Sequence, residues 1–166
     1  MVAEEEGGKV TRELRFRVLD ENGHIWPVIG LLWSPGSNAL THVQTPAEWW
    51  RADEVVVMQF TGLRDKNGKE IFEGDIVLQR IDFGTSGKRP KGKPYVLCPG
   101  HIAWNRHTGE WHVSHELNKE HYERIVRGNG TDWYRVTCLP VADGIWPTVE
   151  VIGNIYEHPD LLEALP

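Results

Sequence analysis

The sequence predicts a mainly β fold built from many short strands. Over several short runs apolar side chains alternate with polar ones, which is the period of a strand with one buried face. Turn-forming Gly, Asn, Asp and Pro residues interrupt these runs about every 8–12 residues, and helical patterns are few and short. A chain with these features is typical of an all-β barrel or sandwich. The 166 residues, 40% hydrophobic and 25% charged, suit one soluble globular domain.

The first elements are a strand and a hairpin. Apolar side chains alternate over residues 14–19, and the Asn22-Gly23 pair predicts a turn that returns the chain through residues 25–33. A loop over residues 34–39 is rich in Gly, Pro, Ser and Asn. We expect residues 45–50 to form a helical turn, because Thr45 suits the N-cap and Pro46 the first helical position.

The centre of the chain contains the strongest turn signals. A dense apolar run over residues 55–60 predicts a strand. Asn67-Gly68 predicts a two-residue type I′ hairpin turn, which needs positive φ at both positions. Gly74-Asp75 then reverses the chain into a strand over residues 76–81.

The second half alternates loops with further elements. A long polar loop covers residues 82–94, and strands over residues 95–104 and 111–114 are expected to pair across a turn at residues 107–109. Residues 116–127 form the best helix candidate, with favourable i,i+4 charge pairs. The last expected elements are strands at residues 133–139 and 149–156 and a short helix that Pro159 opens and that ends near Leu165.

Three segments of the chain resemble one known family. They are RELRFRVLD at residues 12–20, MQFTGLRDKNGKEIFEGDIV at residues 58–77 and VEVIGNIYEHPDLLE at residues 149–163. Together they resemble the YopX family, small proteins met mostly in bacteriophages and prophages of Gram-positive bacteria. The resemblance implies an SH3-like small barrel and no assigned biochemical activity. Residues 82–94 and 100–147 depart from the pattern and are expected to be elaborations, either a second lobe or a decoration of one barrel.

Composition and charge narrow the class of protein. Residues 1–10 are polar and acidic and predict a disordered tail before a β domain over residues 11–166. A net charge of −6 and a pI near 5.7 argue against a protein that binds nucleic acid over its whole surface. No apolar stretch approaches the roughly 20 residues of a membrane span, and no signal-peptide core is present. We therefore expect a cytoplasmic protein in which Cys98 and Cys138 are reduced, half-buried thiols.

Four acids near the central hairpin lie close enough in the chain to suggest a metal site or an acid–base pair, namely Asp65, Glu70, Glu73 and Asp75. An EF-hand alignment fails, because it puts Leu63 at the first ligand position and Gly74 at the bidentate one. We favour structural roles instead. Asp65 is expected to shape the turn, Glu70 to be solvated and Asp75 to bond its own backbone.

Five of the eight histidines lie within twenty-one residues, at His101, His107, His112, His115 and His121. Their spacings do not match the i,i+4 pairs of a zinc-binding helix, so the cluster is interpreted as incidental. The sequence also has no nucleophile elbow and no phosphate-binding loop. It therefore predicts no catalytic residue, no metal and no cofactor.

A local basic run provides the main specific alternative. It consists of Arg80, Lys88, Arg89, Lys91 and Lys93. Small β-barrels bind single-stranded nucleic acid by combining such a groove with stacking aromatic rings. Candidate rings here are Phe83, Tyr95, Trp104 and Trp111.

The function that the sequence favours is a non-catalytic binding or interaction module. Sheet edges that a second subunit can complete, and eight Trp residues, suggest self-association or binding of another protein. Trp49, Trp50 and Trp111 are the candidate interface residues, because polar neighbours flank each of them. The alternatives are a nucleic-acid-binding accessory protein that uses residues 80–93, and an uncharacterised enzyme that uses the acids or histidines above.

Overall fold

The computed structural model describes residues 13–82, 95–115, 145–146 and 149–162. Over these residues the chain is mainly β, as predicted, with one short 3-10 helix η3 (Pro159–Leu162). The strands are β1 (Phe16–Leu19), β2 (Ile25–Pro27), β3 (Gly30–Trp33), β4 (Leu40–Gln44), β5 (Trp49–Arg51), β6 (Val56–Asp65), β7 (Glu70–Phe72), β8 (Asp75–Asp82), β9 (Tyr95–Asn105), β10 (Glu110–Ser114), β11 (Ile145–Trp146) and β12 (Val149–Asn154). The predicted helix at residues 116–127 and the predicted strand at residues 133–139 lie outside the described residues.

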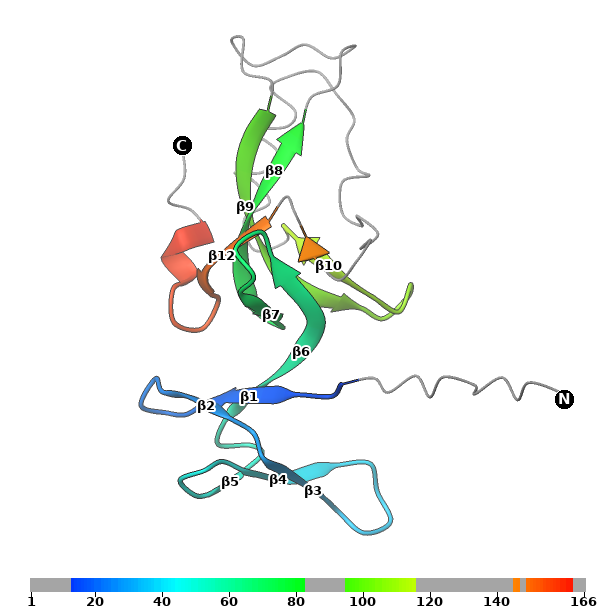
Figure 1. Ribbon diagram of the computed structural model, residues 1–166. Helices are drawn as coiled ribbons and strands as arrows, with labels where there is room; N and C mark the ends of the chain where they lie inside the picture. Colours follow the sequence, from blue (N-terminus) through cyan, green and yellow to red (C-terminus); the bar gives the residue numbers. More distant parts are fainter. Residues whose placement is uncertain (1–12, 83–94, 116–144, 147–148, 163–166) are drawn as a thin grey trace, which may run out of the picture.

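The described strands form three open sheets rather than one closed barrel (Figure 1). The first has the order β11-β6-β1-β2, with β7 also paired to β6. The second has the order β10-β9-β8-β12, and the third the order β3-β4-β5. Every pair is antiparallel except β11 with β6. The predicted mainly β fold is therefore confirmed for this part of the chain, while the SH3-like small barrel that the resemblance implies stays an expectation.

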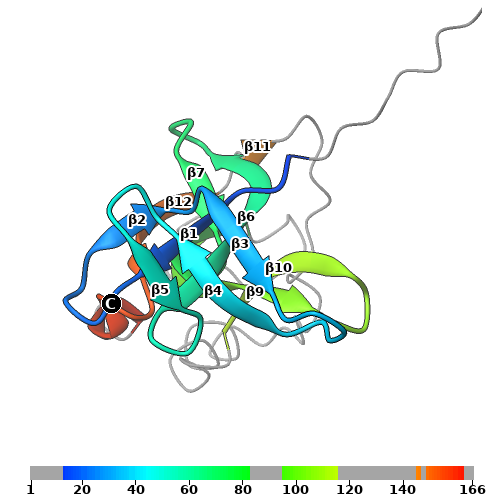
Figure 2. The ribbon, with the colours of Figure 1, turned by 90° about the horizontal axis from the view of Figure 1, so that it is seen from below.

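The small sheet β3-β4-β5 forms a layer of its own. In Figure 1 it lies below β1 and β2, and Figure 2 shows it from below, in front of β1 and β6. The long β8–β9 ribbon extends to the opposite end of the molecule (Figure 1). Among the described residues, no helix has the length and apolar character needed to cross a membrane.

The two Asn-Gly hairpins have the same turn, and it differs from the predicted one. In the β6–β7 hairpin the Asp65 N–H donates to Lys69 O at 2.8 Å and the Gly68 N–H donates to Asp65 O at 2.9 Å. The loop thus holds three residues, with Gly68 at a φ of +82°. This is a type I turn followed by a left-handed residue, so the predicted two-residue type I′ turn is wrong in length. The β1–β2 hairpin repeats the pattern between Asp20 and His24, with Gly23 also at +82°.

An aspartate at the start of each loop explains the longer turn. Asp65 Oδ1 accepts hydrogen bonds from the N–H groups of Asn67 and Lys69, at 2.8 and 2.9 Å. Asp20 Oδ1 does the same for Asn22 and His24, both at 2.9 Å. A carboxylate that bonds the backbone two and four residues later stabilises the three-residue loop. Asp65 therefore shapes its turn as predicted.

The predicted helical turn at residues 45–50 is wrong, because the chain forms a β4–β5 hairpin there. The capping bond does form: the Glu48 N–H donates to Thr45 Oγ1 at 3.2 Å. However, the Thr45 N–H donates back to Glu48 O at 2.9 Å, which closes a tight turn. Trp49 and Trp50 then pair with Gln44 and Val43 of β4. Large aromatic side chains favour strands, and here cross-strand pairing prevails over the local helix signal.

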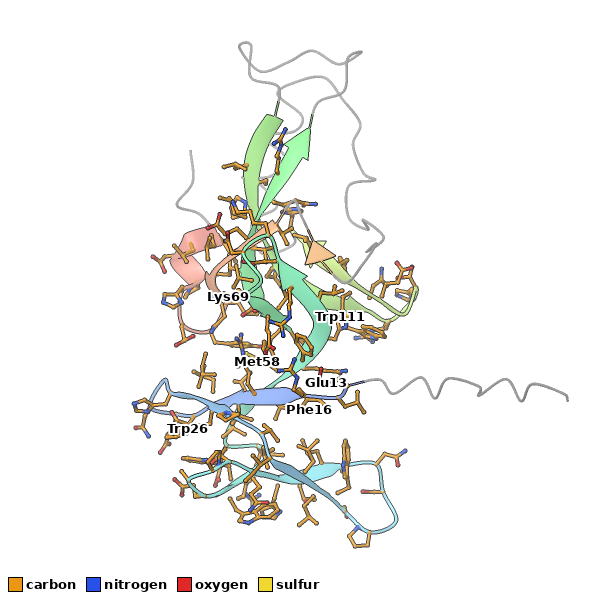
Figure 3. All side chains as sticks on the ribbon, in the orientation of Figure 1. Glu13, Phe16, Trp26, Met58, Lys69 and Trp111 are labelled. Atoms are coloured by element: carbon orange, nitrogen blue, oxygen red, sulfur yellow. The ribbon has the colours of Figure 1, made fainter. Side chains whose placement is uncertain are left out.

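Two clusters of buried apolar side chains make the core. One joins β7, β8, β9, β10 and β12 and consists of Ile71, Val77, Ile102, Val113, Val149 and Val151. The other joins β1, β6 and β7 and consists of Leu19, Met58, Phe60 and Phe72. The Phe60 and Phe72 rings pack with centroids 5.3 Å apart. In Figure 3 Met58 of β6 lies just above β1, and its side chain is fully buried.

Two arginines, Arg17 of β1 and Arg15 just before it, cover the second cluster. The Arg15 guanidinium lies 4.1 Å from the centre of the Phe60 ring, and that of Arg17 lies 4.4 Å from the centre of the Phe72 ring. Arg15 also forms two bonds to the Glu70 carboxylate, at 2.9 and 2.8 Å. Arg17 pairs with the buried Asp75. Each arginine thus combines an aromatic face with a carboxylate, and each links β1 to the region of β7 and β8.

Candidate functional site

The structure places Trp49 and Trp50 on opposite faces of the small sheet. Trp50 pairs with Val43, which is fully buried, so its side chain lies on the inner face. Trp49 pairs with Gln44, which in turn pairs with Gly30, and its side chain is 51% exposed on the outer face. Of these two candidates, Trp49 is exposed, whereas Trp50 is half-buried.

Other large apolar side chains on or next to the same sheet are also exposed. Leu32 is 51% exposed and shares the outer face with Trp49. The rows Leu32–His42–Arg51 and Gly30–Gln44–Trp49 lie two residues apart along the strands, and residues two apart in a strand point to the same face. Trp33 at the end of β3 is 52% exposed, and Ile29 just before β3 is 61% exposed. We call Ile29, Leu32, Trp33 and Trp49 the apolar patch. The almost continuous apolar run of residues 25–33 is the signal that could have revealed it, because a strand with such a run carries apolar side chains on both faces.

The third candidate, Trp111, lies in a different part of the molecule. It sits on β10 directly opposite Trp104 of β9, as the predicted pairing around residues 107–109 implies. The two rings meet edge to face, with centroids 5.0 Å apart and planes at 67°. Trp111 also packs on the first core cluster and is half-buried, whereas Trp104 is 44% exposed. In Figure 3 Trp111 lies beside β6, well away from the β3-β4-β5 sheet.

A pocket of about 310 Å³ opens beside these two rings. Its lining residues are Gln59 of β6, Glu73 from the turn after β7, Trp104 and Trp111. Burial raises the pKa of the Glu73 carboxyl, against the lowering effect of a hydrogen bond from the Gln59 backbone. Burial and the charge of Glu73 also raise the pKa of the nearby Tyr156 hydroxyl. The sequence indicates Glu73 only as one of four clustered acids, because its pocket partners come from other elements of the chain.

The other three acids near the central hairpin have structural roles. Asp65 accepts backbone hydrogen bonds, and Asp75 accepts one from the Phe72 N–H at 2.8 Å while pairing with Arg17. Burial raises the pKa of Asp75, and the Arg17 charge opposes this rise. Glu70 is not simply solvated as expected, because it pairs with both Arg15 and Arg64. Within the described part of the chain, no three His, Cys, Asp or Glu residues gather as metal ligands would.

Cys98 and His115 lie as close together as a reactive cysteine–histidine pair, but they lack the thiolate and imidazolium charges of such a pair. Cys98 Sγ lies 3.9 Å from His115 Nδ1, and that nitrogen donates its proton to the Pro99 carbonyl at 2.9 Å. Burial raises the pKa of the Cys98 thiol to about 12 and lowers that of His115 to about 4. A nucleophilic thiolate needs the opposite shifts, so both groups are neutral near pH 7. Cys98 is fully buried rather than half-buried as expected, and Cys138 lies outside the described residues.

Only one residue of the basic run lies in the described part of the chain. Arg80 is exposed on β8 and pairs in register with Leu97 of β9. The remaining four basic residues, Lys88, Arg89, Lys91 and Lys93, lie outside the described residues, as does His121 of the histidine cluster. Nucleic-acid binding through this run therefore stays a prediction.

Comparison with known proteins identifies the family. A model of the family described as YopX protein matches residues 15–163. The chain belongs to the YopX family. The crystal structure of protein EF1440 from Enterococcus faecalis is similar to this YopX-family chain, with a TM-score of 0.52 and 24% identity, over 92% of this chain and 99% of that one. At that identity the similarity shows the fold alone. The curated proteins include no match to the chain.

Proposed function

We propose that this YopX-family chain is a non-catalytic interaction module that associates with a second copy of itself through the β3-β4-β5 sheet. The observation that carries the proposal is the apolar patch. Its four large side chains are each at least 51% exposed and lie on or next to one small sheet. Exposed apolar groups gathered in this way are typical of protein interaction sites, whereas scattered ones are ordinary.

The edges of the same sheet support the proposal. Within the described residues, β3 and β5 each pair only with β4, so each has one side without a strand neighbour. An edge strand with free N–H and C=O groups pairs readily with another chain. Trp49 lies on β5 and Leu32 on β3, so partner contacts at either edge would also cover an apolar side chain. Trp is the residue most enriched among interface hot spots.

The size of the sheet sets the expected affinity. With strands about 4.8 Å apart, the outer face of a three-stranded sheet is only about 15 Å wide. A standard stable interface buries about 800 Å² on each partner, which is more than this face provides. We therefore expect a concentration-dependent dimer with a Kd of about 1 μM, or about −8 kcal/mol, rather than an obligate one.

The test is the mass in solution by light scattering coupled to size exclusion, at several protein concentrations and at low and high salt. We expect a dimer that persists at high salt, because the contacts are apolar. Trp49→Ala should weaken association by about tenfold or more. Trp104→Ala is the matched control, since Trp104 is similarly exposed but distant from the sheet, and it should associate like the wild type.

Three outcomes would contradict the proposal. A protein that stays monomeric at the highest concentration lacks the association altogether. An oligomer that Trp49→Ala leaves unchanged uses another surface. A monomer with a high ratio of absorbance at 260 to 280 nm, which loses nucleic acid at high salt, would instead favour binding through the basic run.

A further inference from the structure

The pocket beside Trp104 and Trp111 has the chemistry of a cation site. Besides the two rings it contains one carboxylate, from Glu73, and one amide side chain, from Gln59. The face of an indole ring is electron-rich and attracts cations, and Trp is the best aromatic side chain for this contact. The pocket therefore combines a formal negative charge with two rings of the most suitable type.

The same combination of an aromatic ring and a carboxylate around a cation occurs at two other places in the chain. Arg15 lies over the Phe60 ring and binds the Glu70 carboxylate, and Arg17 lies over the Phe72 ring and binds Asp75. The two cations come from β1 and from the residue just before it. Glu73 differs, because no Lys or Arg among the described residues lies within ion-pair distance of it, and both nearby arginines are engaged elsewhere.

The geometry of the rings leaves room for a ligand. Their edge-to-face contact at 5.0 Å fixes Trp111 against the core while Trp104 keeps 44% of its surface exposed. The pocket volume of about 310 Å³ lies at the lower end of the range for small-molecule sites, roughly 300–1,000 Å³. That space suits a compact head group rather than a large planar ligand.

We propose that the pocket formed by Gln59, Glu73, Trp104 and Trp111 binds an alkylated ammonium group. A weakly hydrated ammonium surrounded by methyl groups fits aromatic walls, while Glu73 supplies the opposite charge. The group can come from a free quaternary amine or from a methylated lysine side chain of a protein. The inference is independent of the proposed self-association, since the pocket and the apolar patch share no residue.

The test measures binding by isothermal titration calorimetry and by quenching of Trp fluorescence. The first probe is choline, compared with 3,3-dimethyl-1-butanol, which has the same shape without the charge. We expect choline to saturate the site with a Kd of about 1 mM and the neutral probe to bind at least about fivefold more weakly. A second arm uses N-acetyl-trimethyllysine amide, and tighter binding than choline would identify a protein side chain as the source.

Two variants locate the site and one serves as a control. Trp104→Ala and Glu73→Gln should each weaken choline binding by about fivefold. Both are expected to fold, because Trp104 is partly exposed and Gln has the shape of Glu. Trp33→Ala removes an equally exposed indole from the apolar patch and should bind like the wild type. Equal binding of the neutral probe, unchanged binding by both pocket variants, or no saturation at about 50 mM choline would each overturn the proposal.

Discussion

Asp65 offers the sharpest test of how this fold is held together. Its carboxylate is 1% exposed and accepts three backbone hydrogen bonds. Two come from its own turn, from Asn67 and Lys69, and the third comes from Val151 of β12 at 3.0 Å. One side chain thus joins the β6–β7 hairpin to a strand that is 86 positions away in the chain.

Asp65→Asn keeps the shape of the side chain and removes this bonding capacity. The amide has one oxygen, so when it serves the turn its NH₂ group faces the Val151 N–H, donor against donor. A buried N–H without an acceptor costs about 1–3 kcal/mol, and the two turn bonds also lose their charge assistance. We expect the free energy of unfolding to fall by about 3 kcal/mol, a large share of the 5–15 kcal/mol typical of a domain.

The assay is urea unfolding followed by Trp fluorescence and circular dichroism at pH 7. The matched control is Asp20→Asn. Asp20 makes the same turn bonds, but its second oxygen accepts from the Trp26 side chain in the β1–β2 hairpin rather than from a distant strand. The free energy of unfolding should fall clearly less in Asp20→Asn, because the Trp26 N–H that then faces the amide belongs to a half-buried side chain that can reach water, whereas the Val151 N–H is buried. Equal losses in the two variants, or no loss in Asp65→Asn, would refute the argument that the Val151 bond matters.

The pH dependence gives a second readout of Asp65. Burial raises its pKa, but the N–H groups of Val151, Lys69 and Asn67 outweigh burial and hold the pKa below the usual value of 3.8. A carboxyl with a lowered folded pKa adds stability above its unfolded pKa and loses it as the pH falls through the folded value. Below about pH 4 the wild type should therefore approach the stability of Asp65→Asn. A gap that stays constant down to pH 2 would contradict this linkage.

Three further predictions concern the region around Gly100. A Cβ at Gly100 would lie 2.5 Å from Val113 Cγ1, so Gly100→Ala should lower the free energy of unfolding in urea by about 1–3 kcal/mol. If the variant is as stable as the wild type, the strands can move apart to accept the methyl group. Because burial lowers the His115 pKa from 6.5 to about 4, the unfolded state binds its proton first as the pH falls. Stability should drop by about 3 kcal/mol between pH 6.5 and 4, and His115→Gln should flatten that drop. The third prediction uses a Cys138→Ser background, so that Cys98 is the one remaining thiol. Because Cys98 is buried and burial raises its pKa to about 12, it should react with a thiol reagent orders of magnitude more slowly in the native protein than in urea. Fast labelling of the native protein would disprove this.

Local signals in the sequence predict much of the fold. The alternation in β1, the dense run of β6 and the glycines at turns each depend on neighbours in the chain, and the structure contains these elements. The pairing of Trp104 with Trp111 also follows, because both flank one short turn. The helical turn predicted at residues 45–50 is wrong for an identifiable reason. A Thr45 oxygen that accepts from the Glu48 N–H suits both a helix start and a tight hairpin, and only pairing with β4 decides between them.

Long-range contacts account for most of what the sequence did not predict. Glu70 looks solvated in a polar segment, but it binds Arg15, which is 55 positions away. The pocket draws Gln59 from β6, Glu73 from the turn after β7 and the two tryptophans from β9 and β10, so its residues come from two different sheets. No periodicity within a single segment encodes such a meeting. The candidate residues Trp49 and Trp50 show the same limit. Neighbours in a strand point to opposite faces, but the register with β4 determines which of the two faces inward.

The separate layer of β3, β4 and β5 has a consequence for hydrogen exchange. Both core clusters lie in the other two sheets, and within the small sheet Val43 alone is a fully buried apolar side chain among the described residues. A unit with so little buried apolar surface opens at a lower free energy than the rest of a protein. Backbone amides of residues 30–51 should therefore exchange through their own opening reaction, while those of β8, β9 and β12 exchange only on global unfolding. Binding of a second chain to the sheet would remove this difference, so amide protection of residues 30–51 would rise with protein concentration.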